Sequence, residues 1–452
     1  MAFANFGEEK VMKKQMFRGA TLCVLAMGAT VARADEVTYW NNVLLDCVRT
    51  TGAPPPKASR AMAITHLAVY DAVNSIAKTH NPYHYTTNVN PNCSKEAAVA
   101  QAAYQALDAL FPTRHAVLSA HLTNRLDQIQ NGQAKTDGIS VGAAAGADLL
   151  ALRANDGSNL PADPYLGDSS TPGKWRPTPN AFAPGLLPRW REVTPFGLAS
   201  GSQFRQPGPP SLTSSEYTDA YNEVKRLGKS TGSDRTQDQT DIALYWADGG
   251  GTSTPPGHWN RIAQEVGTSQ GNTIEENARM FALLNMTVAD AGIACWDMKY
   301  EYSFWRPVSA IQLGDTDGNA QTAGDATWMP LIATPPFPTY TSGHSTFSGG
   351  AAEILGSFFG TDEIAFTDAA EGVNLTRSFT GFDHAAGEAA DSRLYGGIHY
   401  RFDNQIGLEM GTQIGTYNYQ HYLTPVPEPG TVFALSGAAA FFLLGRRRKV
   451  QV

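Results

Sequence analysis

Apolar positions along the chain recur at helical spacing, and strict alternation of apolar and polar residues is scarce. The clearest helix begins at Thr273, where Thr273 and Glu276 form a capping box. Its apolar residues then step by three and four along one face, at Phe281, Leu284, Val288, Ala291 and Cys295. The pattern predicts a helix that runs from Thr273 to about Met298.

Five other segments predict helices, and one long segment predicts none. The helical segments are 59–76, 95–111, 210–228, 345–359 and 404–422. Residues 155–215 are rich in Gly, Pro and Ser, which indicates a long irregular excursion. The sequence therefore predicts an all-α fold, a helical bundle with long Gly/Pro-rich loops.

Both ends of the chain have the composition of targeting segments. Lys13, Lys14 and Arg18 precede an apolar stretch at 19–32, and "ARA" at 32–34 fits a small-residue cleavage site, so we expect a signal peptide at 1–34. "VPEPGT" at 426–431 precedes an apolar run at 432–444 and the basic cluster 446–449. This end, 425–452, resembles the PEP-CTERM sorting signal of Gram-negative bacteria. We expect an exported protein in the periplasm, at the outer surface or in the extracellular matrix, with the tail as a transient anchor.

The charge of the body excludes some partners. Residues 1–34 carry five cations and two anions, so the 29 Lys and Arg that remain face 40 Asp and Glu. Such a body has no electrostatic reason to bind nucleic acid. Beyond the leader, Cys47, Cys93 and Cys295 allow at most one disulfide, whose pairing stays open.

Cations and histidines gather in the second half of this acidic chain. Lys299 ends the long helix, and Arg306 follows it before Pro307. The stretch "PTYTSGHST" at 338–346 supplies a serine, a glycine and a histidine. The stretch "DSRLYGGIHYRFDN" at 391–404 supplies an arginine, a histidine and an aspartate. The six residues of these two stretches are Ser342, Gly343, His344, Arg393, His399 and Asp403.

A tetrahedral or trigonal-bipyramidal oxyanion is the ligand that such a set suits. Two arginines and a lysine can neutralise its equatorial oxygens. A helix N-terminus adds N–H groups, and Gly343 lets that backbone come close. One histidine can then lie on the axis as nucleophile or ligand, with the other opposite it as acid or base.

Three blocks of this region resemble the signature of the type 2 phosphatidic acid phosphatase and vanadium haloperoxidase superfamily. The blocks are Lys299-x6-Arg306-Pro307, Ser342-Gly343-His344 and Ser392-Arg393-x5-His399, in this order and with matching spacing. The segments at 58–76 and 278–307 also resemble the bacterial haloperoxidase-related branch. The resemblance implies a helical bundle of the haloperoxidase/acid phosphatase type. Its catalytic domain would be 256–424, after an N-terminal helical half at 35–255 that includes the excursion.

The resemblance also implies roles for the residues and a cofactor, vanadate, whose pocket phosphate can also occupy. Lys299, Arg306 and Arg393 would hold equatorial oxygens, while Ser342 and Gly343 add hydrogen bonds. His399 would bind vanadium and His344 would be the acid–base. By its spacing, Asp403 can orient His399. One departure is Thr341, which replaces the proline usual before this Ser-Gly-His and is expected to loosen the turn.

Two aromatic residues favour oxidation over hydrolysis in such a pocket. Trp296 lies three residues before Lys299, and Phe337 lies seven before His344. In chloride-oxidising members of the family, aromatics beside the halide occupy the matching places, although both residues can equally be core. We therefore expect a vanadium-dependent haloperoxidase that uses hydrogen peroxide and a halide or small organic substrate. The halide stays open, and because helical relatives often dimerise, so does a homodimer.

Parts of the same sequence pattern also fit other functions. A soluble acid phosphatase with His399 as its phosphohistidine nucleophile is the main alternative. A serine hydrolase is disfavoured because Ser342 lacks a G-x-S-x-G elbow. His384 and Glu388 have zinc-ligand spacing but no third ligand nearby, so a solvated helix face is expected. A secreted matrix protein with a relic pocket is a further alternative, disfavoured by the intact residue set.

Overall fold

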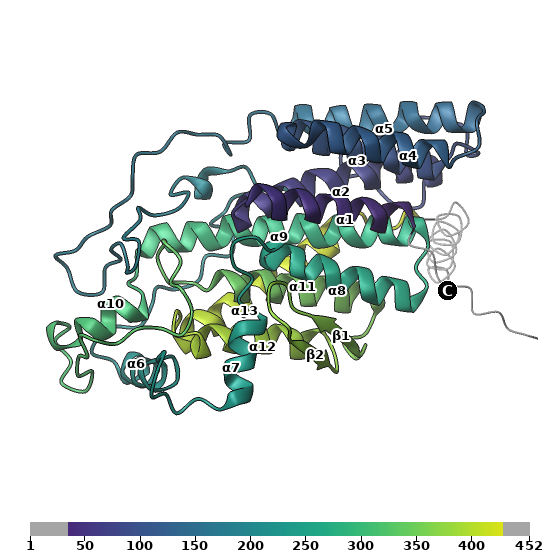
Figure 1. Cartoon of the computed structure of the whole chain (residues 1–452). Helices are drawn as coiled ribbons and strands as arrows, with labels where there is room; N and C mark the ends of the chain where they lie inside the picture. Colours follow the sequence, from purple (N-terminus) through teal and green to yellow (C-terminus); the bar gives the residue numbers. More distant parts are fainter. Residues whose placement is uncertain (1–34, 428–452) are drawn as a thin grey trace, which may run out of the picture. The chain divides into compact units, whose positions relative to one another are not determined.

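The computed structural model describes residues 35–427, and these residues form thirteen α-helices and one two-stranded hairpin (Figure 1). The helices of the first half are α1 Glu36–Thr51, α2 Pro55–Ala77, α3 Lys95–Leu110, α4 His115–Asp127, α5 Gln133–Leu152, α6 Ser215–Leu227 and α7 Gln237–Tyr245. Those of the second half are α8 Thr254–Gln270, α9 Ile274–Tyr302, α10 Pro307–Gln312, α11 Gly343–Phe359, α12 Phe382–Tyr395 and α13 Arg401–His421. Strands β1 Phe366–Ala369 and β2 Thr376–Phe379 pair antiparallel. The predicted all-α fold is confirmed, with this short hairpin as the only addition in the described part.

Helix α9 lies between two groups of helices and is buried along nearly all of its length. It packs against α2 on one side, where α2, α3 and α5 pack on one another, and against α11 and α13 on the other (Figure 1). Its capping box at Thr273 and Glu276 forms as predicted. Among residues 35–427, α9 is the one helix long and apolar enough to cross a membrane, and 94% of its most apolar window is buried in the body.

The segment between α5 and α6 is the irregular excursion that its composition predicts, with a single 3₁₀ turn at Trp190–Glu192. The buried Asp290 of α9 holds this excursion in place. The Asp290 carboxylate accepts hydrogen bonds from the main-chain N–H groups of Phe196 (2.6 Å) and Gly197 (2.8 Å). These bonds satisfy main-chain donors that the excursion cannot pair within itself. Leu186, another residue of this excursion, lines the pocket described below.

Helices α11 and α13 cross at glycines, and this crossing brings the two histidine motifs together. A Cβ on Gly411 would lie 2.2 Å from the Thr346 carbonyl oxygen, and one on Gly349 would lie 2.3 Å from the Leu408 carbonyl oxygen. The backbones can approach this closely only because neither residue has a side chain. The N-terminus of α11 therefore lies beside the first turn of α13, where Ser342 N–H donates to the Asp403 carbonyl (3.1 Å).

Some expectations need correction or stay untested. Helix α9 continues past Met298 to Tyr302, where Ser303 ends it in the left-handed region with φ 49°. Cys47, Cys93 and Cys295 are all free and buried, so they form no disulfide with one another. The division at residue 255 stays a prediction. The expected signal peptide and nearly all of the sorting tail lie outside the described residues.

The glycine crossing gives a stability prediction. Gly411→Ala will lower the free energy of unfolding by about 1–3 kcal/mol, because its methyl group overlaps the Thr346 carbonyl. Gly356→Ala on α11 is the matched control, since a Cβ there meets nothing within 4 Å. It will be neutral or will stabilise by up to about 1 kcal/mol. Urea unfolding followed by circular dichroism measures both, and equal effects would contradict a close crossing.

Candidate functional site

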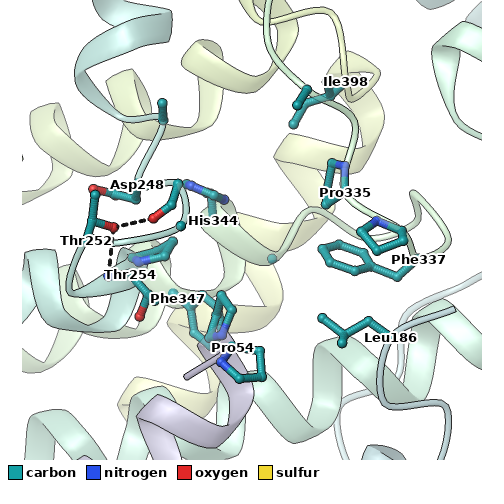
Figure 2. A pocket seen from close by; sticks show the side chains of 18 of the residues that line it. Pro54, Leu186, Asp248, Thr252, Thr254, Pro335, Phe337, His344, Phe347 and Ile398 are labelled. Atoms are coloured by element: carbon teal, nitrogen blue, oxygen red, sulfur yellow. Dashed lines mark hydrogen bonds between the residues drawn. The ribbon is translucent and has the colours of Figure 1, made fainter. Parts of the chain in front are cut away.

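A pocket of about 410 Å³ opens beside the N-terminus of α11 (Figure 2). Two of its walls are loops, 247–252 between α7 and α8 and 333–337 before α11. Figure 2 shows Asp248, Thr252 and Thr254 on the side of His344, with Pro335 and Phe337 on the opposite side. Gly343, Arg393 and His399 also line it, while Lys299, Arg306 and Ser342 lie behind the lining. The three blocks of the sequence motif thus meet in one place.

Two of the three cations are held by main-chain carbonyls. The Lys299 ammonium donates to the carbonyls of Pro338 (3.0 Å), Thr339 (3.0 Å) and Thr341. The Arg306 guanidinium donates to those of Phe337 (2.8 Å) and Ile398 (2.8 Å). The cations therefore shape the two loops that carry the histidines.

Arg393 is the third cation, and it reaches the pocket from the end of α12. Its Nη1 donates to the Trp246 carbonyl at 2.7 Å. Burial lowers the pKa of Lys299 to about 7, of Arg306 to about 9 and of Arg393 to about 10. An anion in the pocket would offset the cost of burying these charges.

His399 lies between a cation and a carboxylate. Its Nδ1 lies 2.9 Å from Asp403 Oδ2, and its Nε2 lies 3.0 Å from Arg306 Nη1. Since a guanidinium only donates, Nε2 carries the lone pair and Nδ1 carries the proton that Asp403 accepts. Thr339 also donates its hydroxyl to Asp403 Oδ2. The ring is thus fixed with Nε2 on the side of the cations, and the predicted partnership of Asp403 with His399 is present as a contact.

The Ser342-Gly343-His344 stretch forms the start of α11. Ser342 is the N-cap residue, and its Oγ accepts a hydrogen bond from Ser345 Oγ at 2.9 Å, which leaves its own proton free to donate. Thr341 does not loosen the turn, because its buried hydroxyl donates to the Asp403 carbonyl and ties the turn to α13. This bond replaces the rigidity that a proline would supply.

His344 is neutral in this environment. Burial lowers its pKa well below the usual range, with Arg393 and His258 adding to the effect, while the carbonyls of Ala247 and Trp246 oppose it. Its Nε2 is buried and has no hydrogen-bond partner. His344 therefore brings an unused ring nitrogen to the pocket.

Trp296 and Phe337 are both core and pocket wall. Their ring centroids lie 5.0 Å apart, and both rings line the pocket. Lys299 Nζ lies 5.0 Å from the Phe337 centroid, and Arg306 Cζ lies 4.8 Å from it. The aromatic wall thus covers the cations on one side and keeps water from them.

An oxyanion such as vanadate fits the donors that are left over. Arg306 Nη2, Arg393 Nε and His344 Nε2 are buried nitrogens without hydrogen-bond partners. Buried polar atoms are normally paired, so each unpaired one calls for an explanation, and a bound ion is one of them. Two cationic donors and one histidine around a single pocket match the chemistry of a phosphate-like anion.

Sequence reasoning missed several contributors and placed one residue in the wrong kind of element. Thr339 lies within the quoted motif, where its hydroxyl was an available signal. Asp248 precedes Gly249–Gly251 in a loop far from the motif, and nothing in the pattern marked it. His258 lies outside the segments that the sequence predicts as helices, but it is on α8 and is wholly buried.

The zinc and serine-hydrolase alternatives gain no support. Glu388 is not on a solvated face, because it pairs with Arg377 (2.6 Å) and accepts from Trp246 (3.0 Å). No group of three or more His, Cys, Asp or Glu side chains in residues 35–427 could hold a metal ion. The Ser342 hydroxyl accepts a hydrogen bond from the Ser345 hydroxyl, and no histidine among residues 35–427 is hydrogen-bonded to it.

The buried lysine gives a pH prediction for anion binding. Lys299 is charged below its pKa of about 7 and neutral above it, so affinity for an anion will fall as pH rises through this region. Tungstate is the suitable probe, because it is a tetrahedral dianion that does not itself titrate near the pKa of Lys299. Calorimetric titration measures the affinity, and Lys299→Met should weaken binding and flatten its pH dependence. Equal slopes for both proteins would contradict this role.

Comparisons with known proteins agree with the geometry. Residues 279–427 match the VCPO second helical-bundle domain, and residues 425–449 match the PEP-CTERM protein-sorting motif. The chain is 28% identical to the vanadium chloroperoxidase of Curvularia inaequalis over 81% of this chain and 78% of that protein. The crystal structure of a bacterial vanadium-dependent iodoperoxidase is similar with a TM-score of 0.77 and 28% identity, covering 87% of this chain and 97% of that one.

A bacterial vanadium-dependent chloroperoxidase shares the fold, with a TM-score of 0.65, 16% identity and coverage of 82% of this chain and 94% of that one. The three motif blocks, the pocket that unites them and these matches agree. Residues 279–427 thus form a VCPO second helical-bundle domain, and the chain is similar to vanadium haloperoxidases over most of its length and carries a PEP-CTERM sorting motif.

Proposed function

We propose that the chain is an exported vanadate-dependent haloperoxidase that oxidises halide with hydrogen peroxide, with vanadate bound at His399. The observation that carries this proposal is the set of unpaired buried nitrogens on Arg306, Arg393 and His344 around one pocket. Both solved relatives named above, one at 28% identity, are vanadium-dependent peroxidases. The choice of halide is left to experiment.

The residues that would hold vanadate already have the required chemistry. Lys299, Arg306 and Arg393 would neutralise the charge on its oxygens, and His399 Nε2 would bind the metal through its lone pair. Ser342 would donate its free hydroxyl proton, and Gly343 would donate its N–H at the start of α11. Bound vanadate supplies a Lewis acid that activates peroxide without a change of oxidation state.

His344 is the proton carrier in this proposal. Because its pKa is lowered, it is neutral near pH 7 and can take a proton from peroxide at Nε2. Asp403 keeps the His399 proton on Nδ1, so that Nε2 stays a ligand. The aromatic wall of Trp296 and Phe337 suits a desolvated halide better than a hydrated phosphate monoester.

The sorting motif supports export, and the compartment is part of the proposal. We infer that the protein works in the periplasm, at the outer surface or in the extracellular matrix of a Gram-negative bacterium. The motif at 425–449 begins where the described body ends, since Val426 N–H still donates to the Thr79 carbonyl at 3.0 Å. The sorting machinery would therefore receive a tail that leaves the body at a fixed point.

The proposal predicts vanadate-dependent halide oxidation. The purified protein with vanadate will oxidise iodide, bromide or chloride by hydrogen peroxide, and His399→Ala will abolish this activity because it removes the ligand to the metal. Hydrolysis of p-nitrophenyl phosphate is assayed in parallel. Phosphatase activity without vanadate that vanadate inhibits, with no halide oxidation, would instead establish the acid phosphatase alternative.

The contact between Asp403 and His399 gives a second prediction. Asp403→Asn will weaken vanadate binding about 10–100-fold, because an amide no longer fixes the His399 proton on Nδ1. Equilibrium dialysis of vanadate measures this. Glu409→Gln is the matched control, because Glu409 is an exposed residue of the same helix. If both variants bind vanadate as the wild type does, Asp403 does not orient the ligand.

A further inference from the structure

The long helices of the body share two ends, and the pocket lies at one of them. Pro55 at the start of α2, Pro255 near the start of α8 and Gly343 at the start of α11 all line the pocket. His399 lies just before α13, and Lys299 lies in the last turn of α9. The pocket therefore marks one end of this group of five helices.

A second cavity, of about 460 Å³, marks the other end of the same group. It is lined by Val73 from the last turns of α2, by Arg279 from the second turn of α9 and by Phe358 from the last turn of α11. Helix α9 runs between the two ends beside α2 (Figure 1). At about 1.5 Å per residue, the rise from Arg279 to Lys299 separates the two ends by about 30 Å.

The chain leaves the body at the end that carries the second cavity. Beyond α13, Leu423 is buried, and its carbonyl accepts a hydrogen bond from Arg279 Nε at 2.9 Å. The main-chain N–H of Val426 then donates to the Thr79 carbonyl at 3.0 Å. Arg279 and Thr79 both line the second cavity. The base of the sorting tail is therefore attached to the end of the bundle that lies opposite the pocket.

The link between this base and the apolar part of the tail is short. Residues 427–431 separate Val426 from the apolar run at 432–444, and even a fully extended chain spans at most about 20 Å over that distance. This reach is less than the rise of about 30 Å between the two ends of α9. The basic cluster at 446–449 follows the apolar run and favours the cytoplasmic side of a membrane. A membrane that holds the apolar run would thus lie close to the second cavity.

The charge of the body opposes contact between its flank and a bilayer. After residue 34, 29 Lys and Arg face 40 Asp and Glu, and four of those cations belong to the tail. An acidic surface is repelled by anionic lipids, so it has no electrostatic reason to lie along them. The body is therefore held by its tail end alone.

We propose that the tail end of the bundle faces the bilayer while the chain is anchored, and that the pocket lies at the far end, away from lipid. This inference rests on the export and anchoring part of the proposed function. The pocket is then supplied from the aqueous phase, and an oxidant formed in it is released away from lipid and from the sorting machinery. The anchored chain is therefore already competent before its tail is removed.

Energy transfer to a lipid acceptor measures this orientation. The mature chain with its tail, residues 35–452, is bound to vesicles of phosphatidylcholine and phosphatidylglycerol that carry a headgroup acceptor. Gln270→Cys at the end of α8 and Gly250→Cys at the pocket mouth each give one exposed site for a donor dye, because the native cysteines of this chain are buried. We expect strong transfer from position 270 and at least about threefold weaker transfer from position 250, because the two ends lie about 30 Å apart.

A longer tether is the matched variant for this measurement. Inserting about ten Gly/Ser residues after Pro427 lets the body move away from the bilayer and rotate. Transfer from position 270 will fall, and the difference between the two labels will shrink. Unchanged transfer would show that the short link does not set the orientation and would overturn the inference.

Tungstate affinity gives a second readout that does not depend on activity. The negative potential of phosphatidylglycerol fades within a Debye length, about 10 Å at 0.1 M salt, so a pocket about 30 Å away does not sense it. We expect the anchored chain to bind tungstate with the same affinity, within about twofold, on anionic and on neutral vesicles. Affinity that is several times weaker on anionic vesicles would place the pocket beside the lipid and overturn the inference.

The remaining outcomes separate this inference from the haloperoxidase proposal. Equal transfer from the two labels, or stronger transfer from position 250, would overturn the orientation, as would a chain that does not bind vesicles. These results leave the haloperoxidase proposal standing, because halide oxidation is assayed in solution. A chain that shows the expected transfer but binds neither tungstate nor vanadate would overturn the haloperoxidase proposal and leave the orientation standing.

Discussion

The burial of three cations against main-chain carbonyls is the constraint on which the rest of the site depends. Lys299 and Arg306 hold the carbonyls of residues 337–341 and 398, and Arg393 holds that of Trp246. These bonds fix three separate loops around one pocket and leave donors on both arginines unused. Carbonyl oxygens satisfy hydrogen bonds but do not cancel charge, so the site is electrostatically incomplete without an anion.

Contacts between helices fix the positions of the residues around the pocket. The glycine crossing of α11 and α13 sets Ser342 and His344 against Asp403, and Asp403 in turn orients His399. Ser342 at the start of α11 is thus tied to Asp403 on α13, and Asp403 is tied to His399. Binding residues held on rigid elements lose little entropy when the ligand arrives.

The buried carboxylates near the pocket, like the cations, have defined hydrogen-bond partners. Asp403 is directed to His399 and Thr339, and Asp248 is directed to His258. Both carboxylates are buried close to arginines that an anion requires. Each of the two carboxylates therefore has a histidine as a partner. Residues 247–252 line the pocket, and the β1–β2 hairpin contributes Asp368 to the contacts of His258, although both lie outside the motif blocks.

The sequence by itself determined the helical class, because 3.6-residue periodicity is a local property. It also identified the cations and histidines that meet around one pocket, because their order and spacing are fixed along the chain. It also identified the tail, whose composition is distinctive. It placed the end of α9 four residues too early, because the helix ends where Ser303 enters the left-handed region and not where the apolar pattern stops. Only the tertiary structure decided that Thr341 ties its turn to α13 and that Asp248 and His258 belong to the pocket. Those contacts join residues far apart in the sequence, and no spacing rule records which buried charges will meet.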